Sequence, residues 1–206
     1  LMQTIKIGEF NYSRTKIKNN ILKVYVKSLK SEKNDWYREA NQWAVDVSNF
    51  LYSFKGMKVT VKQILGITSA LSPLKEWENN KQLTLDMILT SDCGHMKNNK
   101  LKADKILMAH SSISDDDILK ILSGPKTSRF YMNMMYPNNG TGVTIDRHAI
   151  AIAIGRNATE KEQVMSDKVY TFVEDCYKMT AYRLGLTPLH LQSITWQAWK
   201  RIKATR

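Results

Sequence analysis

The chain has 206 residues, of which 43% are hydrophobic and 9% aromatic. This is enough to bury a sizeable core in one compact unit or in two small helical lobes, and it excludes disordered and fibrous proteins. The formal net charge is +12, from 31 Lys and Arg against 19 Asp and Glu. Such a balance favours a polyanionic partner, with nucleic acid before an anionic membrane surface; a lysine-rich solubilising surface is the alternative.

The positive charge gathers at the two ends of the chain. Residues 1–33 hold eight Lys and Arg against two acids, Glu9 and Glu32. Residues 196–206 add four positive charges and no acid: Lys200, Arg201, Lys203 and Arg206. The ends are therefore candidates for phosphate contacts, with a solvated, frayed C-terminus as the alternative for the second cluster.

Several protein classes are disfavoured by what the sequence lacks. It has no uncharged apolar run of eighteen residues and no signal-peptide pattern, so we expect neither a transmembrane helix nor secretion. Cys93 and Cys176 are far apart, and the four histidines are scattered, which argues against a disulfide framework, a structural zinc or an iron–sulfur cluster. We expect a cytoplasmic protein.

Hydrophobic spacing predicts a mainly helical first half. Weak alternation from Met2 to Phe10 indicates a short strand or an arm. Apolar residues then recur at helical spacing, ending in breakers such as Gly56 and Pro73. The predicted helices cover residues 20–30, 35–54, a segment capped by Thr60 that stops before Pro73, residues 76–89 and residues 97–110.

Residues 114–135 predict two short helices joined by a tight turn. Ser114 is a candidate N-cap, and three aspartates follow it in the first turn, where the helix dipole favours acids. Ser123-Gly124-Pro125 stops the first helix, and the second runs from Lys126 to Met135. The result is a helix-hairpin-helix, whose turn amides can point at a phosphate.

The last third of the chain completes an all-α prediction. After a loop and the short extended run Val143-Thr144-Ile145, Asp146 caps a helix that Gly155 ends. A helix is predicted over residues 169–184, and a last one begins at Thr187 with Pro188 in its first position. The sequence thus predicts about nine helices and almost no sheet.

Two segments in this order resemble a known family. Gly124-Pro125-Lys126-Thr127, followed by Ile145-Asp146-Arg147-His148, is similar to the core of the HhH-GPD superfamily of base-excision DNA glycosylases, which includes endonuclease III. The segment from Ile67 to Ser72 is similar to the family's Leu-Leu-Ser-x-Gln stretch. The pattern Ser72-Pro73, Trp77, Asn80 and the C-terminal segment from Leu191 look like a short, phage-encoded branch. The detailed resemblance covers roughly residues 60–155.

The resemblance implies a two-lobed helical fold. Residues 1–54 with 147–206 would form a terminal lobe, and residues 55–146 a central lobe that contains the helix-hairpin-helix. The sequence departs from the family at four points. Leu122 replaces the first glycine of the hairpin, and Pro125 removes an amide donor. The polar wedge residue expected near Leu71 or Ser72 is not found, and the C-terminal four-cysteine motif is absent.

The resemblance assigns catalytic roles to Lys126 and Asp146. A lysine amine can attack the anomeric carbon of the sugar, expel the base and form a Schiff base, and the positive helix end favours its neutral form. A carboxylate steadies the positive charge that builds on the sugar. The alternatives are a solvated lysine at a helix start and an ordinary N-cap aspartate.

The resemblance also implies contacts to double-stranded DNA. The predicted phosphate contacts are Ser123, Gly124, Thr127, Ser72, Lys200 and Arg201. The predicted pocket for the flipped base contains Trp77, Asn80, Arg147 and His148, although His148 is also typical of a core histidine. We expect a monomer without metal cofactor or iron–sulfur cluster, located in the cytoplasm of the host if phage-encoded; the hairpin leaves room for a monovalent cation.

Three functions fit these observations. The first is a DNA glycosylase, with or without AP-lyase activity, that flips and excises a modified or damaged base. The second is an enzyme of the same fold that transfers a group to hydroxymethylpyrimidine bases in phage DNA. The third is a DNA-binding protein without catalysis. Fold alone does not separate them, because function depends on the site.

Overall fold

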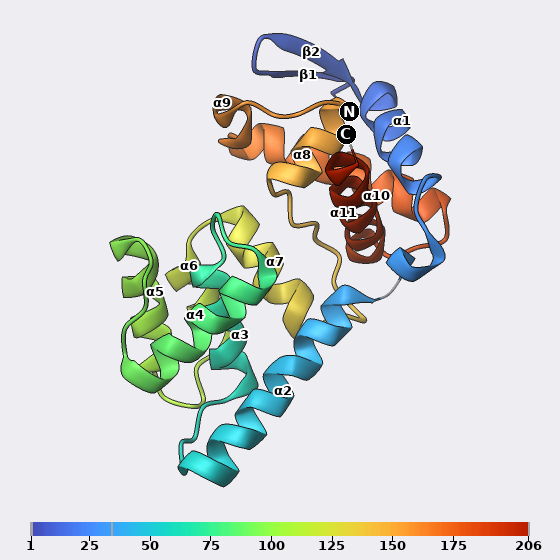
Figure 1. The fold of residues 1–206 in the computed structure, drawn as a ribbon. Helices are drawn as coiled ribbons and strands as arrows, with labels where there is room; N and C mark the ends of the chain where they lie inside the picture. Colours follow the sequence, from blue (N-terminus) through green and yellow to red (C-terminus); the bar gives the residue numbers. More distant parts are fainter. Residues whose placement is uncertain (1, 34, 206) are drawn as a thin grey trace. The chain divides into compact units, whose positions relative to one another are not determined.

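The computed structural model describes residues 2–33 and 35–205, and these are mainly helical (Figure 1). The chain divides into two compact units: Leu1–Tyr37 with Asn138–Arg206, called unit 1, and Arg38–Pro137, called unit 2. The all-α class is therefore confirmed, and a two-stranded antiparallel sheet is the only sheet among the described residues.

The unit boundaries differ from the expected ones, which lay after residues 54 and 146. The first boundary falls near the start of the long helix α2 (Trp36–Lys55), because this helix packs within unit 2. Asn41 Nδ2 donates to the Met134 carbonyl at 2.9 Å, and the Trp43 ring meets the Trp77 ring at 5.4 Å. The second falls before the extended run 143–145, whose hydrogen bonds lie in unit 1.

Unit 1 combines the two ends of the chain. Its elements are β1 (Thr4–Ile7), β2 (Phe10–Ser13), α1 (Arg14–Tyr25), the 3-10 helix η1 (Lys30–Lys33), α8 (Arg147–Ile154), α9 (Glu160–Gln163), α10 (Asp167–Arg183) and α11 (Pro188–Ala204). Every residue of α8 from Ala149 to Ile154 is buried; α1 and α11 pack against this helix, and Tyr177 of α10 donates to the Ala149 carbonyl at 2.9 Å. Gly155 ends α8 in the left-handed region, with φ +79°.

The N-terminal segment differs from its prediction. The expected strand or arm is a hairpin in which Ile5 pairs with Tyr12, and the second strand was not predicted. The helix expected over residues 20–30 is α1, which begins at Arg14 because Ser13 caps it by accepting from Lys16 N at 3.1 Å. It ends at Tyr25, and residues beyond form turns and η1.

Unit 2 is built around α3 (Val61–Leu71), whose residues from Gln63 to Leu71 are all buried. The predicted cap at Thr60 is confirmed and is part of a capping box with Gln63. Besides α2, the other helices of the unit are α4 (Trp77–Thr90), α5 (Lys97–Leu107), α6 (Asp115–Leu122) and α7 (Pro125–Met135). A Cβ on Gly66 would lie 3.2 Å from Ile106, so the close approach of α5 to α3 depends on this glycine.

One of the apolar residues that recur at helical spacing in α2 is exposed. Phe50 shares a helical stripe with buried Leu51, yet it is 50% exposed and stacks on Phe54.

Within the described part of the chain, no helix combines the length and the apolar character that a membrane crossing requires.

Candidate nucleic-acid interface and catalytic residues

The two short helices and the tight turn predicted over residues 114–135 are present in unit 2 (Figure 1). Helices α6 and α7 are joined by Ser123 and Gly124 alone, and Ser114 caps α6 by accepting from Asp117 N at 3.1 Å. Ser123 adopts φ +61°, a left-handed conformation that costs a non-glycine residue about 1 kcal/mol. Pro125 occupies the first position of α7, where a missing N–H is tolerated.

An internal ammonium group binds the carbonyl end of α6. Lys102 of α5 donates through Nζ to the Leu122 carbonyl at 2.8 Å and lies 2.9 Å from Ser123 Oγ. Carbonyl oxygens at a helix C-terminus attract cations because the helix dipole is negative there. Lys102 therefore supplies a positive group at the hairpin, which is where a monovalent cation was considered from the sequence.

Asp115 ties the two ends of the hairpin together. It accepts from Tyr131 Oη at 2.6 Å and from Tyr136 Oη at 2.5 Å, and its Oδ1 lies 3.5 Å from Lys62 Nζ. Burial opposes ionisation of this carboxyl, but the tyrosine hydrogen bonds and Lys62 outweigh it and lower its pKa. Burial and the bond to Asp115 raise the pKa of Tyr131 well above its ordinary value. The sequence showed only an acid in the first turn of α6, so it did not indicate that Asp115 contacts Tyr131, Tyr136 and Lys62.

Lys126 is in the first turn of α7, directly after the turn. Its side chain is half-buried. Ser128 N donates to the Gly124 carbonyl at 3.0 Å and closes the first turn of the helix. The backbone N–H groups of Lys126 and Thr127 come before this bond. They therefore have no hydrogen-bond partner within the helix.

Asp146 follows a segment that side chains of unit 1 hold from several sides. Val143 N donates to Glu174 Oε1 at 2.8 Å, and Ile145 N donates to Tyr170 Oη at 3.0 Å. Tyr170 in turn donates to the Val143 carbonyl at 2.6 Å. Glu174 and Tyr170 are buried, so two core side chains hold the backbone segment that precedes Asp146 in place.

The predicted N-cap at Asp146 is confirmed. Its Oδ1 accepts from His148 N at 3.0 Å and from Ala149 N at 2.8 Å. These bonds use one carboxylate oxygen, and no other described residue bonds to this side chain. The half-buried carboxylate keeps Oδ2 for another partner.

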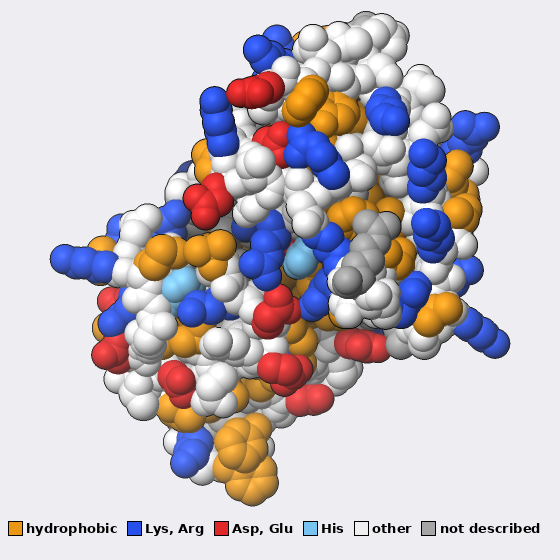
Figure 2. Space-filling model, turned by 45° about the horizontal axis from the view of Figure 1, so that its top comes forward, with side chains coloured by type: hydrophobic (Ala, Val, Ile, Leu, Met, Phe, Trp, Pro, Cys, Tyr) orange, Lys and Arg blue, Asp and Glu red, His pale blue; other side chains and the backbone are white. Residues whose placement is uncertain are grey.

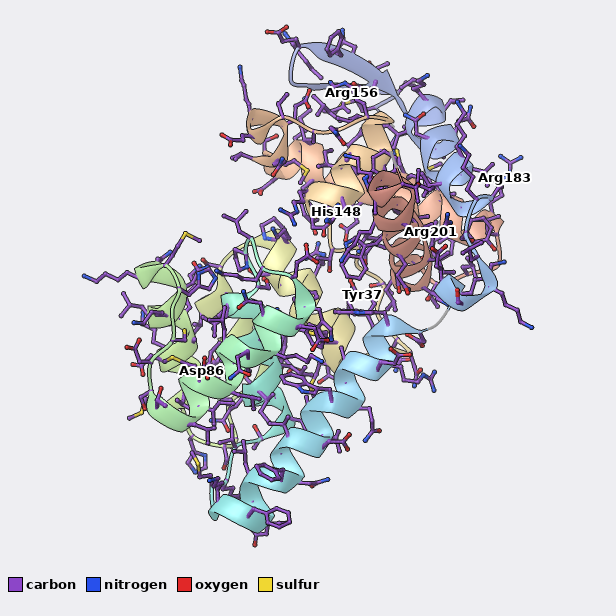
Figure 3. All side chains as sticks on the ribbon, in the orientation of Figure 1. Tyr37, Asp86, His148, Arg156, Arg183 and Arg201 are labelled. Atoms are coloured by element: carbon purple, nitrogen blue, oxygen red, sulfur yellow. The ribbon has the colours of Figure 1, made fainter. Side chains whose placement is uncertain are left out.

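Aromatic and basic side chains surround the start of α8. The His148 ring lies 6.4 Å from the ring of Trp196, and Arg147 Nε donates to His148 Nε2 at 3.4 Å. Trp196 also meets Trp36 at 5.5 Å and carries Lys200 Nζ 4.6 Å above its ring. The predicted residues Asp146, Arg147, His148 and Lys200 thus belong to one region of unit 1, in which Figure 3 labels His148.

Arg201 has a structural partner. Its Nε donates to Glu32 Oε1 at 2.5 Å, and its Nη2 reaches the Lys27 carbonyl at 2.8 Å. The Arg201 guanidinium bond outweighs the opposing effect of burial, and it holds the pKa of Glu32 below its ordinary value. Arg201, labelled in Figure 3, therefore fastens η1 to α11.

The remaining predicted residues lie in unit 2. Trp77 is half-buried and carries Lys81 Nζ 5.6 Å above its ring. Asn80 is 2% exposed, and its side-chain oxygen has no described hydrogen-bond partner, so in this conformation it is closed off from solvent. Ser72 is half-buried at the end of α3 and donates to the Ser69 carbonyl at 2.9 Å.

The predicted site residues are divided between the units. Unit 1 holds Asp146, Arg147, His148, Lys200 and Arg201, and unit 2 holds Ser72, Trp77, Asn80, Ser123, Gly124, Lys126 and Thr127. The two proposed catalytic groups therefore come from different units.

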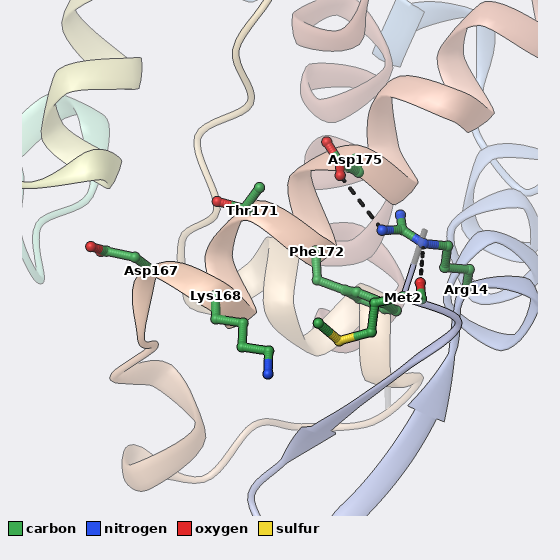
Figure 4. A pocket seen from close by; sticks show the side chains of 7 residues that line it. All are labelled: Met2, Arg14, Asp167, Lys168, Thr171, Phe172 and Asp175. Carbon is green, nitrogen blue, oxygen red and sulfur yellow. Dashed lines mark hydrogen bonds and ion pairs between the residues drawn. The ribbon is translucent and has the colours of Figure 1, made fainter.

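A shallow pocket of about 330 Å³ in unit 1 contains none of these residues (Figure 4). It is lined by Met2, Arg14, Asp167, Lys168, Thr171, Phe172 and Asp175. Arg14 donates to the Met2 carbonyl at 2.7 Å, lies 3.6 Å from Asp175 and covers the Phe172 ring. Nε and Nη2 of Arg14 thus have partners in the protein, whereas the buried Nη1 has no described hydrogen-bond partner.

The positive charge is unequal between the units. Unit 1 contains 18 Lys and Arg against 9 Asp and Glu, and unit 2 contains 13 against 10. Figure 2 shows lysine and arginine side chains over much of the visible face, with exposed hydrophobic side chains among them. Unit 1 is therefore the stronger attractor for a polyanion.

The fold and these residues define a mainly helical, basic protein in which a two-residue turn joins two short helices, α6 and α7. Residues 3–203 match the model of a family of unknown function, DUF7178, and the chain belongs to that family. Comparisons with curated proteins and with solved structures gave no match.

Proposed function

We propose that this protein is a DNA glycosylase that flips a modified or damaged base out of double-stranded DNA and cleaves its N-glycosidic bond. One observation carries the proposal. Lys126 stands in the first turn of a helix after a tight hairpin, and Asp146 caps the next helix, which are the positions that the family resemblance implies. The excess of Lys and Arg in unit 1 supports a DNA partner.

Asp146 would stabilise the sugar cation. As the bond to the base breaks, positive charge develops on the sugar, and a fixed carboxylate lowers the free energy of that state. The support is geometric, because two backbone amides hold Oδ1 while Oδ2 remains for the sugar.

Lys126 would act as the nucleophile. The lone pair of Nζ attacks the anomeric carbon, and the base leaves with the electron pair of the broken bond and takes up the proton that the nitrogen releases. Opening of the sugar ring gives an imine between Nζ and the former anomeric carbon. β-Elimination from this Schiff base then breaks the DNA strand.

Borohydride trapping tests this chemistry directly. Hydride reduces the imine to a stable amine, so the wild-type protein should become covalently attached to a duplex with an abasic site. Lys126→Ala should give no adduct, whereas Lys120→Ala, which removes an exposed lysine of α6, should give as much as wild type. Equal trapping by Lys126→Ala would overturn the assignment. A panel of duplexes with uracil, hydroxymethyluracil, thymine glycol and mismatches identifies the base.

DNA binding without catalysis is the second candidate. The observation that favours it is the cap itself, since the bonds of Asp146 to two amides are also what an ordinary N-cap makes. Salt-dependent duplex binding with no adduct and no base release from the panel would support it. A transferase would instead act only on DNA that carries an activated hydroxymethylpyrimidine.

A further inference from the structure

The C-terminal end of α2 carries an exposed aromatic surface that the proposed catalysis does not use. Phe50 is 50% exposed, Tyr52 68% and Phe54 75%. Phe50 and Phe54 are one helical turn apart, and their rings stack with centroids 5.1 Å apart and planes 29° apart. Large aromatic side chains rarely gather on a surface without a binding role.

The backbone around these rings is held in place. Gly56 N donates to the Tyr52 carbonyl at 3.2 Å, and Met57 N donates to the Leu51 carbonyl at 3.0 Å. Ser48 Oγ donates to the Val59 carbonyl at 2.7 Å, which ties the following segment back onto the helix. Gly56, with φ +63°, allows this turn. The aromatic rings therefore project from a fixed frame.

The chain that follows the rings is basic, whereas Asp46 lies one helical turn before Phe50 on the same helix. The sequence from Val47 to Lys75 contains four lysines and no aspartate or glutamate. Lys55 and Lys58 are exposed directly after the aromatic residues, and no described acidic side chain pairs with either of them. A protein partner would have to match this charge with acids, whereas a nucleic acid brings negative charge and flat apolar bases together.

We propose that the end of α2, defined by Phe50, Phe54, Lys55 and Lys58, binds single-stranded DNA. Unpaired bases stack on the phenylalanine rings, and the two lysines contact the phosphates on either side. Duplex DNA keeps its bases stacked inside the helix, so this surface discriminates in favour of unpaired strands. The inference rests on this surface alone and does not need Lys126 or Asp146.

Fluorescence anisotropy with a labelled thymine oligonucleotide and with a duplex of equal length tests the proposal. The double variant Phe50→Gln with Phe54→Gln should bind the single strand at least about tenfold more weakly and the duplex within about twofold of wild type. Tyr182→Gln, which removes an equally exposed aromatic residue from α10, is the matched control and should change neither. Equal melting temperatures would confirm that the exposed rings do not support the fold.

Other results would overturn the proposal. Unchanged binding of the single strand by the double variant would do so. So would a variant that keeps this binding but loses self-association in sedimentation or binding to anionic vesicles, because the surface would then be a contact to a second copy or to lipid. The trapping experiment is independent. Single-strand binding with neither an adduct nor base release from the panel leaves this inference standing and removes the glycosylase, and the reverse result does the opposite.

Discussion

The carboxylate of Asp146 has a measurable structural function beside its proposed chemical one, since Oδ1 accepts from two amides of α8. Asn caps helices about as well as Asp, so Asp146→Asn should melt within a degree or two of wild type. It loses the negative charge, however, and base release should slow by about a hundred- to a thousandfold. Single-turnover assays on the duplex that gives the most product measure this loss.

Asp146→Ala provides the contrast. It loses the cap as well as the charge, and this should cost about 1 kcal/mol of stability in addition to the activity. If Asp146→Asn keeps full activity and Asp146→Ala only lowers the melting temperature, Asp146 is a cap and not a catalyst.

At the scale of single residues, the sequence predicted helix N-caps better than it predicted the partners of charged side chains. Ser114, Asp146 and Thr187 are N-caps as expected, because a cap depends on residues three positions apart. Arg201 was expected to contact phosphate, yet it binds Glu32, which is 169 positions away. No local pattern reveals such a pair, because only the fold brings its members together.

At the scale of elements, the hairpin is the feature that the sequence predicted most closely. Its two helices and its turn are as expected, since Ser-Gly-Pro is a strong local stop signal, although α7 begins one residue before the predicted start, at Pro125. The hairpin's supports were not predicted. Lys102 comes from α5 and Lys62 from α3, and both act through tertiary contacts. The start of α1 at Arg14 was missed because its cap, Ser13, also ends a strand.

The contact of Lys102 predicts how the hairpin responds to monovalent cations. Because the ammonium already bonds the Leu122 carbonyl, the wild-type melting temperature should be the same in potassium chloride and in tetramethylammonium chloride of equal ionic strength. Lys102→Met should cost about 1 kcal/mol, and it should be less stable in tetramethylammonium than in potassium, which can reach the vacated carbonyl.

The control for this prediction lies on the same helix. Lys105 is exposed on α5, and Lys105→Met should show no difference between the two salts. A wild-type protein that already loses stability when potassium is withdrawn would contradict the assignment of Lys102 as the hairpin's cation.

At the scale of the whole molecule, the net charge of +12 predicts DNA binding that weakens steeply with salt. Each phosphate contact releases counterions, so about six contacts would lose roughly a thousandfold in affinity between 50 and 200 mM salt. Lys200→Ala should weaken binding to all duplex sequences alike and lower the slope of log affinity against log salt by about one. Arg201→Ala should leave that slope unchanged and lower the melting temperature, because Glu32 then remains buried without its partner. Anisotropy titrations at several salt concentrations, with thermal melts of the same samples, measure both effects. An affinity that does not change with salt would show that the protein makes no phosphate contacts, and it would contradict the proposal that DNA is the partner.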